Sequence, residues 1–412
     1  MIYLDYNATT PVDERVLTEM LPYFTEHFGN PSSNTHQFGW YAQGAIDKAR
    51  EQVARFLNAE SFEIVFTSGS TEAINLALKG AFEAYSSKGN HIITCKTEHK
   101  AVLDTCAFIE ENGGTVTYLS VDFEGRIDLE ELKNSFTDKT ILVAIMAANN
   151  ETGVLQDVEK IAEITHQHDA IFFSDTTQMA GKLPIDVNEM GLDMCCISAH
   201  KLYGPKGVGA LYIRRKNPRV NLVPLLHGGG HENHKRSGTL NVTGIVGLGK
   251  TCEIAQAEFW DNNMHLSKLR GYIEHQLLDI PDFRINGSTR YRLYNTTNLY
   301  FPLLKDKSSV FSKLKNNYAV SLGSACGSES ANPSHVLLEM GLTIKEAILA
   351  TLRLSSPAWF AQPIITSTTL LKSTDGFFAI NSFKTKVAKS SVRTVDKVPP
   401  KFPIAVLTPL MI

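Results

Sequence analysis

Between residues 60 and 215, short apolar segments alternate with amphipathic stretches, and this pattern constrains the fold more than any other feature. The apolar segments are continuous and rich in β-branched residues, as expected for strands buried on both faces of a sheet. The alternation predicts an α/β fold, with a mostly parallel, seven-stranded sheet flanked by helices. The predicted strands are 63–67, 90–95, 115–121, 140–148, 170–175, 194–198 and 208–213, and the predicted helices are 71–85, 99–112, 128–136 and 157–169.

The pattern changes after residue 250. A long polar helix is predicted at about 250–278, followed by shorter strands at 297–302 and 318–322 and a helix at 344–351. This part is typical of a smaller α+β domain. The predicted organisation is an N-terminal arm (1–14) that joins the small domain, a large domain (15–250), the small domain (251–356) and a C-terminal tail (357–412).

Composition excludes several classes of function. The formal net charge of −3 over 412 residues gives no long-range reason to expect a nucleic-acid or membrane-surface partner. No apolar run is long enough to span a membrane, and the N-terminus does not have the pattern of a signal peptide. Six cysteines without a CxxC pair indicate reduced thiols in a cytoplasmic protein.

The C-terminal tail differs from the rest of the chain. Residues 355–412 contain seven basic and two acidic residues and no Glu, whereas the chain as a whole has 40 basic and 43 acidic residues. The tail is rich in Ser, Thr and Pro and shows no sustained helical period. We therefore expect residues from about 357 onward to lack a stable packed structure.

In a parallel sheet, ligands bind beyond the carboxyl ends of the strands, so the residues that follow each strand are the candidates for chemistry. The segment 68–71 (SGST) opens a helix and offers backbone N–H groups and hydroxyls to a phosphate, although a plain helix cap explains it equally well. His99 and the amides of 149–150 follow two other strands. Each of these signals alone is also consistent with a structural role.

Two charged residues follow the next strands. Asp175 stands at the end of a buried strand, where a carboxylate is unfavourable without a positive partner. Lys201 leaves the sheet two residues after Ser198, where a lysine can act as a Schiff-base amine. Lys206 is the alternative, but its GPKG context favours a surface turn. A phosphate site, an imidazole, a buried carboxylate and an amine together match the requirements of pyridoxal 5′-phosphate (PLP).

An ordered set of motifs then makes the resemblance specific. The segments YLDYNATTP, GNPSSNTHQFG, SGSTEAIN, TEHKAV, NNETGVLQ, DTTQ, SAHKLYGPKGVGAL, HGGGHENHKRSGTLN and SLGSACGSESANPSHVL occur in this order from residue 1 to about 354. This set resembles the cysteine desulfurases of the NifS/IscS-like type. They belong to the class V aminotransferase-like family of fold-type I PLP-dependent transferases.

The resemblance implies a role for each matching residue. Lys201 would bind PLP covalently, Asp175 would pair with its ring nitrogen, and His99 would stack on the ring and shuttle protons. The remaining cofactor-binding residues would be Ser70, Thr71, Asn150, Gln178, Ser198, His200 and Thr239, the last reaching the phosphate of a partner subunit in a homodimer. Arg353, with Asn7 and Asn150 nearby, would bind the substrate carboxylate.

Cys326 is the predicted nucleophile. Its neighbours in GSACGSES are all small, and such a segment is typical of a surface loop rather than a core. A thiol there can attack a substrate sulfur and carry it as a persulfide. The other five cysteines lie in predicted strands or helices, where a thiol usually packs as a small apolar group.

A metal site is the less favoured interpretation of HGGGHENH (227–234). His227, His231 and His234 are closely spaced, but three glycines indicate a loop and not the helix of an HExxH site. We therefore predict no metal.

The sequence thus predicts an L-cysteine desulfurase, a sulfurtransferase that uses PLP. It would convert L-cysteine to L-alanine and pass sulfur from Cys326 to an acceptor, such as an iron–sulfur scaffold or a tRNA-thiolation protein. Two alternatives stay open: a selenocysteine lyase on the same scaffold, and an impaired PLP-fold scaffold protein, which the abnormal C-terminus favours.

Overall fold

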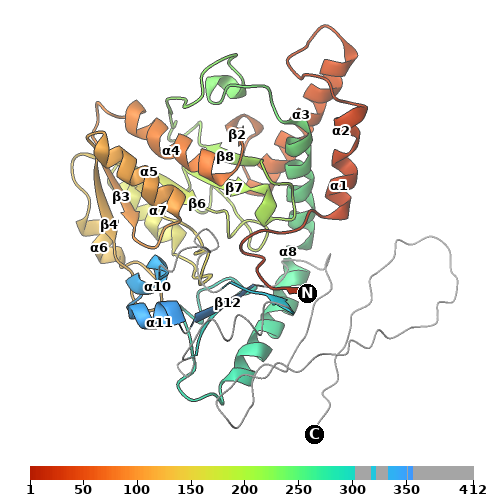
Figure 1. Cartoon of the computed structure of the whole chain (residues 1–412). Helices are drawn as coiled ribbons and strands as arrows, with labels where there is room; N and C mark the ends of the chain where they lie inside the picture. Colours follow the sequence, from red (N-terminus) through yellow and green to blue (C-terminus); the bar gives the residue numbers. More distant parts are fainter. Residues whose placement is uncertain (302–316, 322–332, 350, 356–412) are drawn as a thin grey trace, which may run out of the picture.

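The computed structural model describes residues 1–301, 317–321, 333–349 and 351–355 (Figure 1). The side chains of 260–262, 348–349 and 351–354 lie outside this description. Cys326 and the tail from 357 to 412 also lie outside the described residues, so the predictions for them are not tested.

The large sheet has seven strands in the order β2-β8-β7-β6-β5-β3-β4. Strand β8 runs antiparallel to both of its neighbours, and the other pairs are parallel. This confirms the predicted mostly parallel, seven-stranded sheet. The strands are β2 (Ile64–Thr67), β3 (His91–Cys95), β4 (Thr115–Leu119), β5 (Thr140–Ala144), β6 (Ile171–Asp175), β7 (Met194–Ser198) and β8 (Gly209–Ile213).

Successive strand residues enter two separate cores, one on each face of the sheet. Phe66, Ile93 and Phe172 pack on one face, while their neighbours Ile92 and Phe173 pack on the other. Burial of both faces is why these strands read as continuous apolar runs. Helices α4 (Ser70–Ala84) and α5 (Lys100–Glu111) cover one face, and α3 (Gln37–Leu57), α7 (Val158–Gln167) and α8 (Val242–Leu277) cover the other (Figure 1).

Several helix boundaries follow from side-chain caps. Asp128 caps α6 (Leu129–Asn134) by accepting a hydrogen bond from Glu130 N–H, which confirms the predicted cap. Asn241 caps α8 in the same way, through Gly244 N–H at 3.1 Å, so this helix begins eight residues before the predicted start.

Strand β5 ends at Ala144 and not at the predicted residue 148.

Two further sheets lie beside the large one. Strand β1 (Ile2–Tyr3) pairs in parallel with β11 (Tyr318–Ala319), which ties the start of the chain to a segment far along it. The other sheet has the order β12-β10-β9, and Asp5 forms an isolated bridge with Ser355 at the end of β12. Its strands are β9 (Arg284–Ile285), β10 (Thr296–Tyr300) and β12 (Thr351–Ser355). The other α-helices among the described residues are α1 (Glu14–Met20), α2 (Pro22–Thr25), α10 (His335–Glu339) and α11 (Ile344–Leu349).

Within the described part of the chain, no helix combines the length and apolar character that a membrane span requires.

Candidate active site

Lys201 ends the 3₁₀ turn 199–201 that directly follows β7. Its side chain is half-buried, and its amine donates hydrogen bonds to the carbonyl oxygens of Asn7 (2.5 Å) and Ala8 (2.8 Å). The positive charge of Lys201 contributes to lowering the pKa of His99 and that of His200. These effects place the amine within electrostatic range of two imidazoles at the sheet edge.

Asp175 ends β6 and is buried, with 6% of its surface exposed. Its Oδ1 atom accepts hydrogen bonds from the Thr177 N–H (2.9 Å) and the Cys196 thiol (3.3 Å). Among the residues that the structure describes, no Lys, Arg or His forms an ion pair with it. A buried carboxylate without an ion-pair partner among the described residues is suited to a positively charged ligand atom.

His99 caps the start of α5, and its Nδ1 atom accepts a hydrogen bond from Ala101 N–H at 3.1 Å. In the neutral ring the proton is therefore on Nε2. Burial lowers the pKa of His99; the Asp175 charge raises it, and the Lys201 charge lowers it. The predicted carboxylate and amine thus both act on the predicted imidazole, although the three groups come from three different strand ends.

A cradle of hydroxyls and backbone N–H groups lies at the start of α4. Gly69 precedes this helix with φ +151°, and a Cβ atom at Gly69 would lie 3.5 Å from the Ser198 Oγ. Ser70 Oγ contacts Thr177 Oγ1 at 2.5 Å, which joins the turn after β6 to the helix start. Thr177, not singled out in the sequence, therefore belongs to this group. A helix N-terminus flanked by hydroxyls favours an anion.

Two other predicted residues are placed less directly. His200 contacts Thr9 Oγ1 at 3.1 Å, and burial together with the positive charge of Lys201 lowers its pKa to about 4, so its ring is neutral. Thr71, unlike Ser70, is exposed at the helix start.

Asn7 of the N-terminal arm forms one connected group with Asn150 and Gln178. Asn7 is buried, and its side-chain amide donates to Asn150 O (3.3 Å) and to Thr296 Oγ1 (3.1 Å). Gln178 Nε2 donates to Asn7 O at 3.1 Å. Gln178 Oε1 is buried and has no hydrogen-bond partner among the described residues. The structure therefore brings these three predicted residues together near Lys201.

Two predicted residues are not joined to this group by a described side-chain contact. Thr239 is exposed, three residues after Arg236, whose guanidinium pairs with Glu72 in the first turn of α4 at 2.8 Å. Arg353 lies in β12 opposite Asn298, and its side chain is outside the description.

The five described cysteines are buried: Cys95, Cys106, Cys195, Cys196 and Cys252. Burial raises the pKa of the Cys95, Cys106 and Cys195 thiols to about 12, and it raises the pKa of Cys196 and Cys252 as well. These thiols are therefore protonated at neutral pH and are poor nucleophiles, as the sequence predicts.

In the segment 227–234, the His231 ring makes two hydrogen-bond contacts. His231 Nε2 contacts Ser32 Oγ at 3.1 Å, and its Nδ1 accepts from Gly238 N–H at 3.3 Å. The neighbouring Glu232 is buried and pairs with Arg50 at 2.6 Å. No group of three or more His, Cys, Asp or Glu side chains suited to a metal ion occurs within the described ranges.

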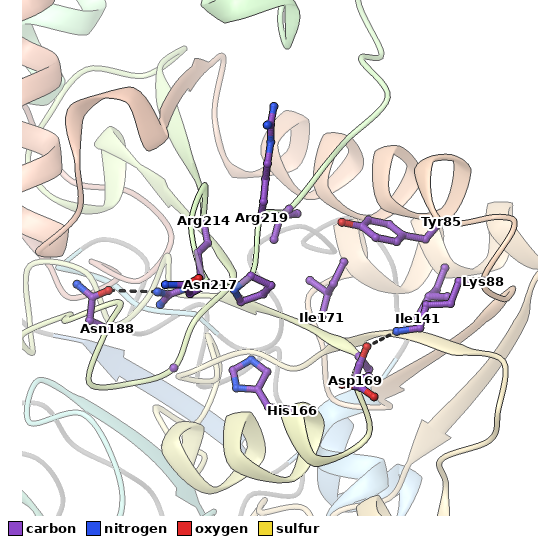
Figure 2. A pocket seen from close by; sticks show the side chains of 14 residues that line it. Tyr85, Lys88, Ile141, His166, Asp169, Ile171, Asn188, Arg214, Asn217 and Arg219 are labelled. Carbon is purple, nitrogen blue, oxygen red and sulfur yellow. Dashed lines mark hydrogen bonds between the residues drawn. The ribbon is translucent and has the colours of Figure 1, made fainter.

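A separate pocket of about 870 Å³ lies where β5 and β6 begin, at the sheet edge opposite the predicted site (Figure 2). Asp193 is fully buried beside it and contacts His166 (2.9 Å) and Arg214 (3.5 Å), two of the residues that line the pocket. None of the predicted site residues lines this pocket. The residues labelled in Figure 2 are Tyr85, Lys88, Ile141, His166, Asp169, Ile171, Asn188, Arg214, Asn217 and Arg219.

Comparison with known proteins places this arrangement in a family. Residues 2–356 match the class-V aminotransferases. The chain is 51% identical to the cysteine desulfurase IscS of Histophilus somni, over 83% of this chain and 84% of that protein. It is 50% identical to the cysteine desulfurase IscS of Neisseria meningitidis, over 82% and 83% of the two chains.

Solved structures agree with this placement. A NifS-like protein superposes with a TM-score of 0.80 at 38% identity, covering 87% of this chain and 94% of that one. SspA in complex with cysteine superposes with a TM-score of 0.77 at 38% identity, covering 87% and 99%. The chain therefore belongs to the class-V aminotransferase family, among the cysteine desulfurases of the IscS and NifS-like type.

Proposed function

We propose that the chain is a PLP-dependent L-cysteine desulfurase that transfers the substrate sulfur to Cys326. The observation that carries the proposal is that Asp175, His99 and Lys201 stand at the carboxyl ends of β6, β3 and β7, where the charges of Asp175 and Lys201 both act on His99. The curated relatives with about half of their residues identical are named cysteine desulfurases, and a structural relative was solved with cysteine.

The described residues fit PLP in three respects. Asp175 offers a buried carboxylate that has no ion-pair partner in the described part of the chain, which suits a protonated ring nitrogen. Gln178 has a buried amide oxygen without a hydrogen-bond partner there. The start of α4, with Ser70 and nearby Ser198, provides N–H groups and hydroxyls for a phosphate.

When bound, PLP supplies an electron sink that makes the Cα proton of the amino acid removable. The residues of the chain have separate tasks. Asp175 would hold a proton at the ring nitrogen, and Lys201 would provide the amine that binds the cofactor and moves the Cα proton. His99 would stack on the ring as a neutral imidazole and donate a proton from Nε2, because its Nδ1 atom accepts a hydrogen bond from Ala101 N–H. Its lowered pKa keeps it neutral at physiological pH.

The sulfur step is assigned to Cys326 from the sequence. Its thiolate attacks the sulfur of the substrate, so that an S–S bond forms and the C–S bond breaks. The electron pair of the broken bond stays with the carbon chain, which takes up a proton and leaves as L-alanine. Cys326 then carries a persulfide, which we propose passes to a sulfur-acceptor protein for iron–sulfur cluster assembly or tRNA thiolation.

We also propose a homodimer that works in the cytoplasm. Large apolar side chains are exposed along α1, α2 and the start of α3, and such a patch on a water-soluble fold usually serves association. Two of its rings, those of Phe28 and Phe38, lie 5.3 Å apart. The exposed residues are Leu17, Leu21, Phe24, Phe28, Phe38, Trp40 and Tyr41. Sedimentation of the wild type and of Phe28→Asp tests this patch, and a monomeric wild type would contradict it.

The central experiment adds L-cysteine to purified, PLP-loaded protein. A visible absorption band that changes on adding L-cysteine, with release of alanine, supports the proposal. Parallel measurements with L-selenocysteine separate a desulfurase from a selenocysteine lyase by their rates of alanine release. Protein that binds no PLP, or binds it without releasing alanine, would favour the impaired scaffold instead.

A further inference from the structure

Lys182 is a buried amine beside the candidate active site. It lies in the turn that follows β6, seven residues after Asp175, and only 2% of its surface is exposed. Gly181, directly before it, has φ +73°, a conformation that glycine adopts without strain. The Lys182 Nζ donates to the carbonyl oxygen of Gln178, four residues earlier, at 2.9 Å.

This contact continues to Lys201 through two residues. The same Gln178 donates from its side-chain amide to Asn7 O at 3.1 Å. Asn7 O also accepts a hydrogen bond from Lys201 Nζ at 2.5 Å. A chain of hydrogen bonds therefore links the two lysine amines. Within it, the backbone carbonyl of Gln178 accepts from Lys182, and the side-chain amide of Gln178 donates to Asn7 O.

A lysine is an unfavourable choice for this position by stability alone. In the described part of the chain, no Asp or Glu forms an ion pair with Lys182. Burial, and then repulsion from Lys201, lower its pKa to about 7. A methionine would fill similar space without desolvating an amine. A residue that opposes folding in this way is expected at functional sites.

We propose that Lys182 is a positioning residue of the cofactor site, which fixes the Gln178 turn and thereby the Gln178 amide and the Asn7 carbonyl that meets Lys201. This inference rests on the proposed function. Lys182 does not touch the reacting atoms in this assignment. It determines where Gln178 and the N-terminal arm stand when PLP enters.

The test compares wild type with Lys182→Met in the full chain. We expect PLP to dissociate about tenfold more readily from the variant, because the Gln178 carbonyl loses its buried donor. We also expect the cofactor-free variant to be at least as resistant to urea as the wild type. Lys160→Met removes an exposed lysine from α7 and is the matched control, with unchanged PLP affinity.

A merely structural lysine would behave in the opposite way. Lys182→Met would then unfold more easily, and the folded molecules would bind PLP like the wild type, which would overturn the inference while leaving the proposed function intact. Should Lys182→Met not fold, Lys182→Leu, which also removes the N–H donor to Gln178 O, is judged by the same two measurements. A wild type without PLP affinity would overturn the proposed function and this inference together.

A double-mutant cycle tests the route through Gln178. We expect Gln178→Leu to weaken PLP binding by itself, and Lys182→Met to add little in the double variant, because both changes disturb the same contact chain. Independent, additive losses would show that Lys182 does not act through Gln178 and would overturn the inference.

Discussion

The side-chain amine of Lys201 lies 2.5 Å from the carbonyl oxygen of Asn7, a residue 194 positions earlier in the chain. The next carbonyl oxygen, that of Ala8, lies 2.8 Å from the same amine. The arm that begins with β1 therefore meets the lysine that follows β7. Under the proposed function, the amine would leave these carbonyl oxygens to bind PLP, which would couple the reactivity of Lys201 to the position of the arm.

Replacing Lys201 with Ala should abolish both the visible band of the PLP-loaded protein and its turnover. The other lysine of the same segment, Lys206, is exposed, whereas Lys201 is half-buried at the strand end. Lys206→Ala is the matched control and should keep the band. Absorption spectra of the two variants decide the assignment, and the reverse pattern would show that it is wrong.

Asp175→Asn should reduce turnover by several orders of magnitude while the protein stays folded. The amide keeps an oxygen for the Thr177 N–H but cannot hold a proton at the ring nitrogen of PLP. Alanine release measures the loss, and circular dichroism checks the fold. Near-normal turnover would mean that another residue faces the nitrogen.

Cys326→Ser should still bind PLP and L-cysteine, but alanine production should collapse because a hydroxyl is a weak nucleophile toward sulfur. Cys252→Ser is the control, since Cys252 is buried in α8 with a raised pKa and should tolerate the change without loss of turnover. Mass spectrometry of peptides after reaction with L-cysteine should locate the persulfide on Cys326. A persulfide on Cys195 or Cys252 would contradict the loop argument.

The sheet was predictable because burial on both faces leaves an unmistakable apolar run at each strand. Helix α3, with 21 residues, was not predicted, although its buried positions such as Ile46 and Val53 repeat at seven residues. The start of α8 was also missed, because its apolar first turns precede the polar stretch on which the prediction depended. Long-range pairing such as Ile2 with Tyr318 depends on tertiary contact and leaves no local pattern.

In the candidate site, too, some residues were predictable from the local sequence and others depend on tertiary contacts. Asp175, His99 and Lys201 follow strands, so the topology of a parallel sheet was enough to group them. Thr177 and Lys182 were not singled out, because a threonine or a lysine two to seven residues beyond a strand end usually faces solvent. Their roles depend on a turn that folds back on itself, seen in the contacts of Thr177 with Ser70 and of Lys182 with Gln178.

The stability of the protein should depend on pH through Lys182. Burial lowers its pKa to about 7 in the folded protein, from 10.5 for an unperturbed lysine, so the unfolded chain binds this proton more tightly. Burying the protonated Lys182 amine therefore lowers the free energy of unfolding by its full amount below pH 7, and this loss diminishes as the pH rises toward 10.5. Since one pKa unit corresponds to about 1.4 kcal/mol, the upper bound of the effect is a few kcal/mol.

Lys182→Met removes this titration and should stabilise the protein most at acidic pH. Its gain in free energy of unfolding over the wild type should be large at about pH 6 and small at about pH 9.5, less about 1 kcal/mol for the lost hydrogen bond to Gln178 O. Urea unfolding at both pH values, without PLP and with saturating PLP, measures the difference. Lys160→Met, at an exposed position, should show no such trend. An equal gain at both pH values would show that Lys182 stays charged throughout, and that its burial does not weaken its hold on the proton.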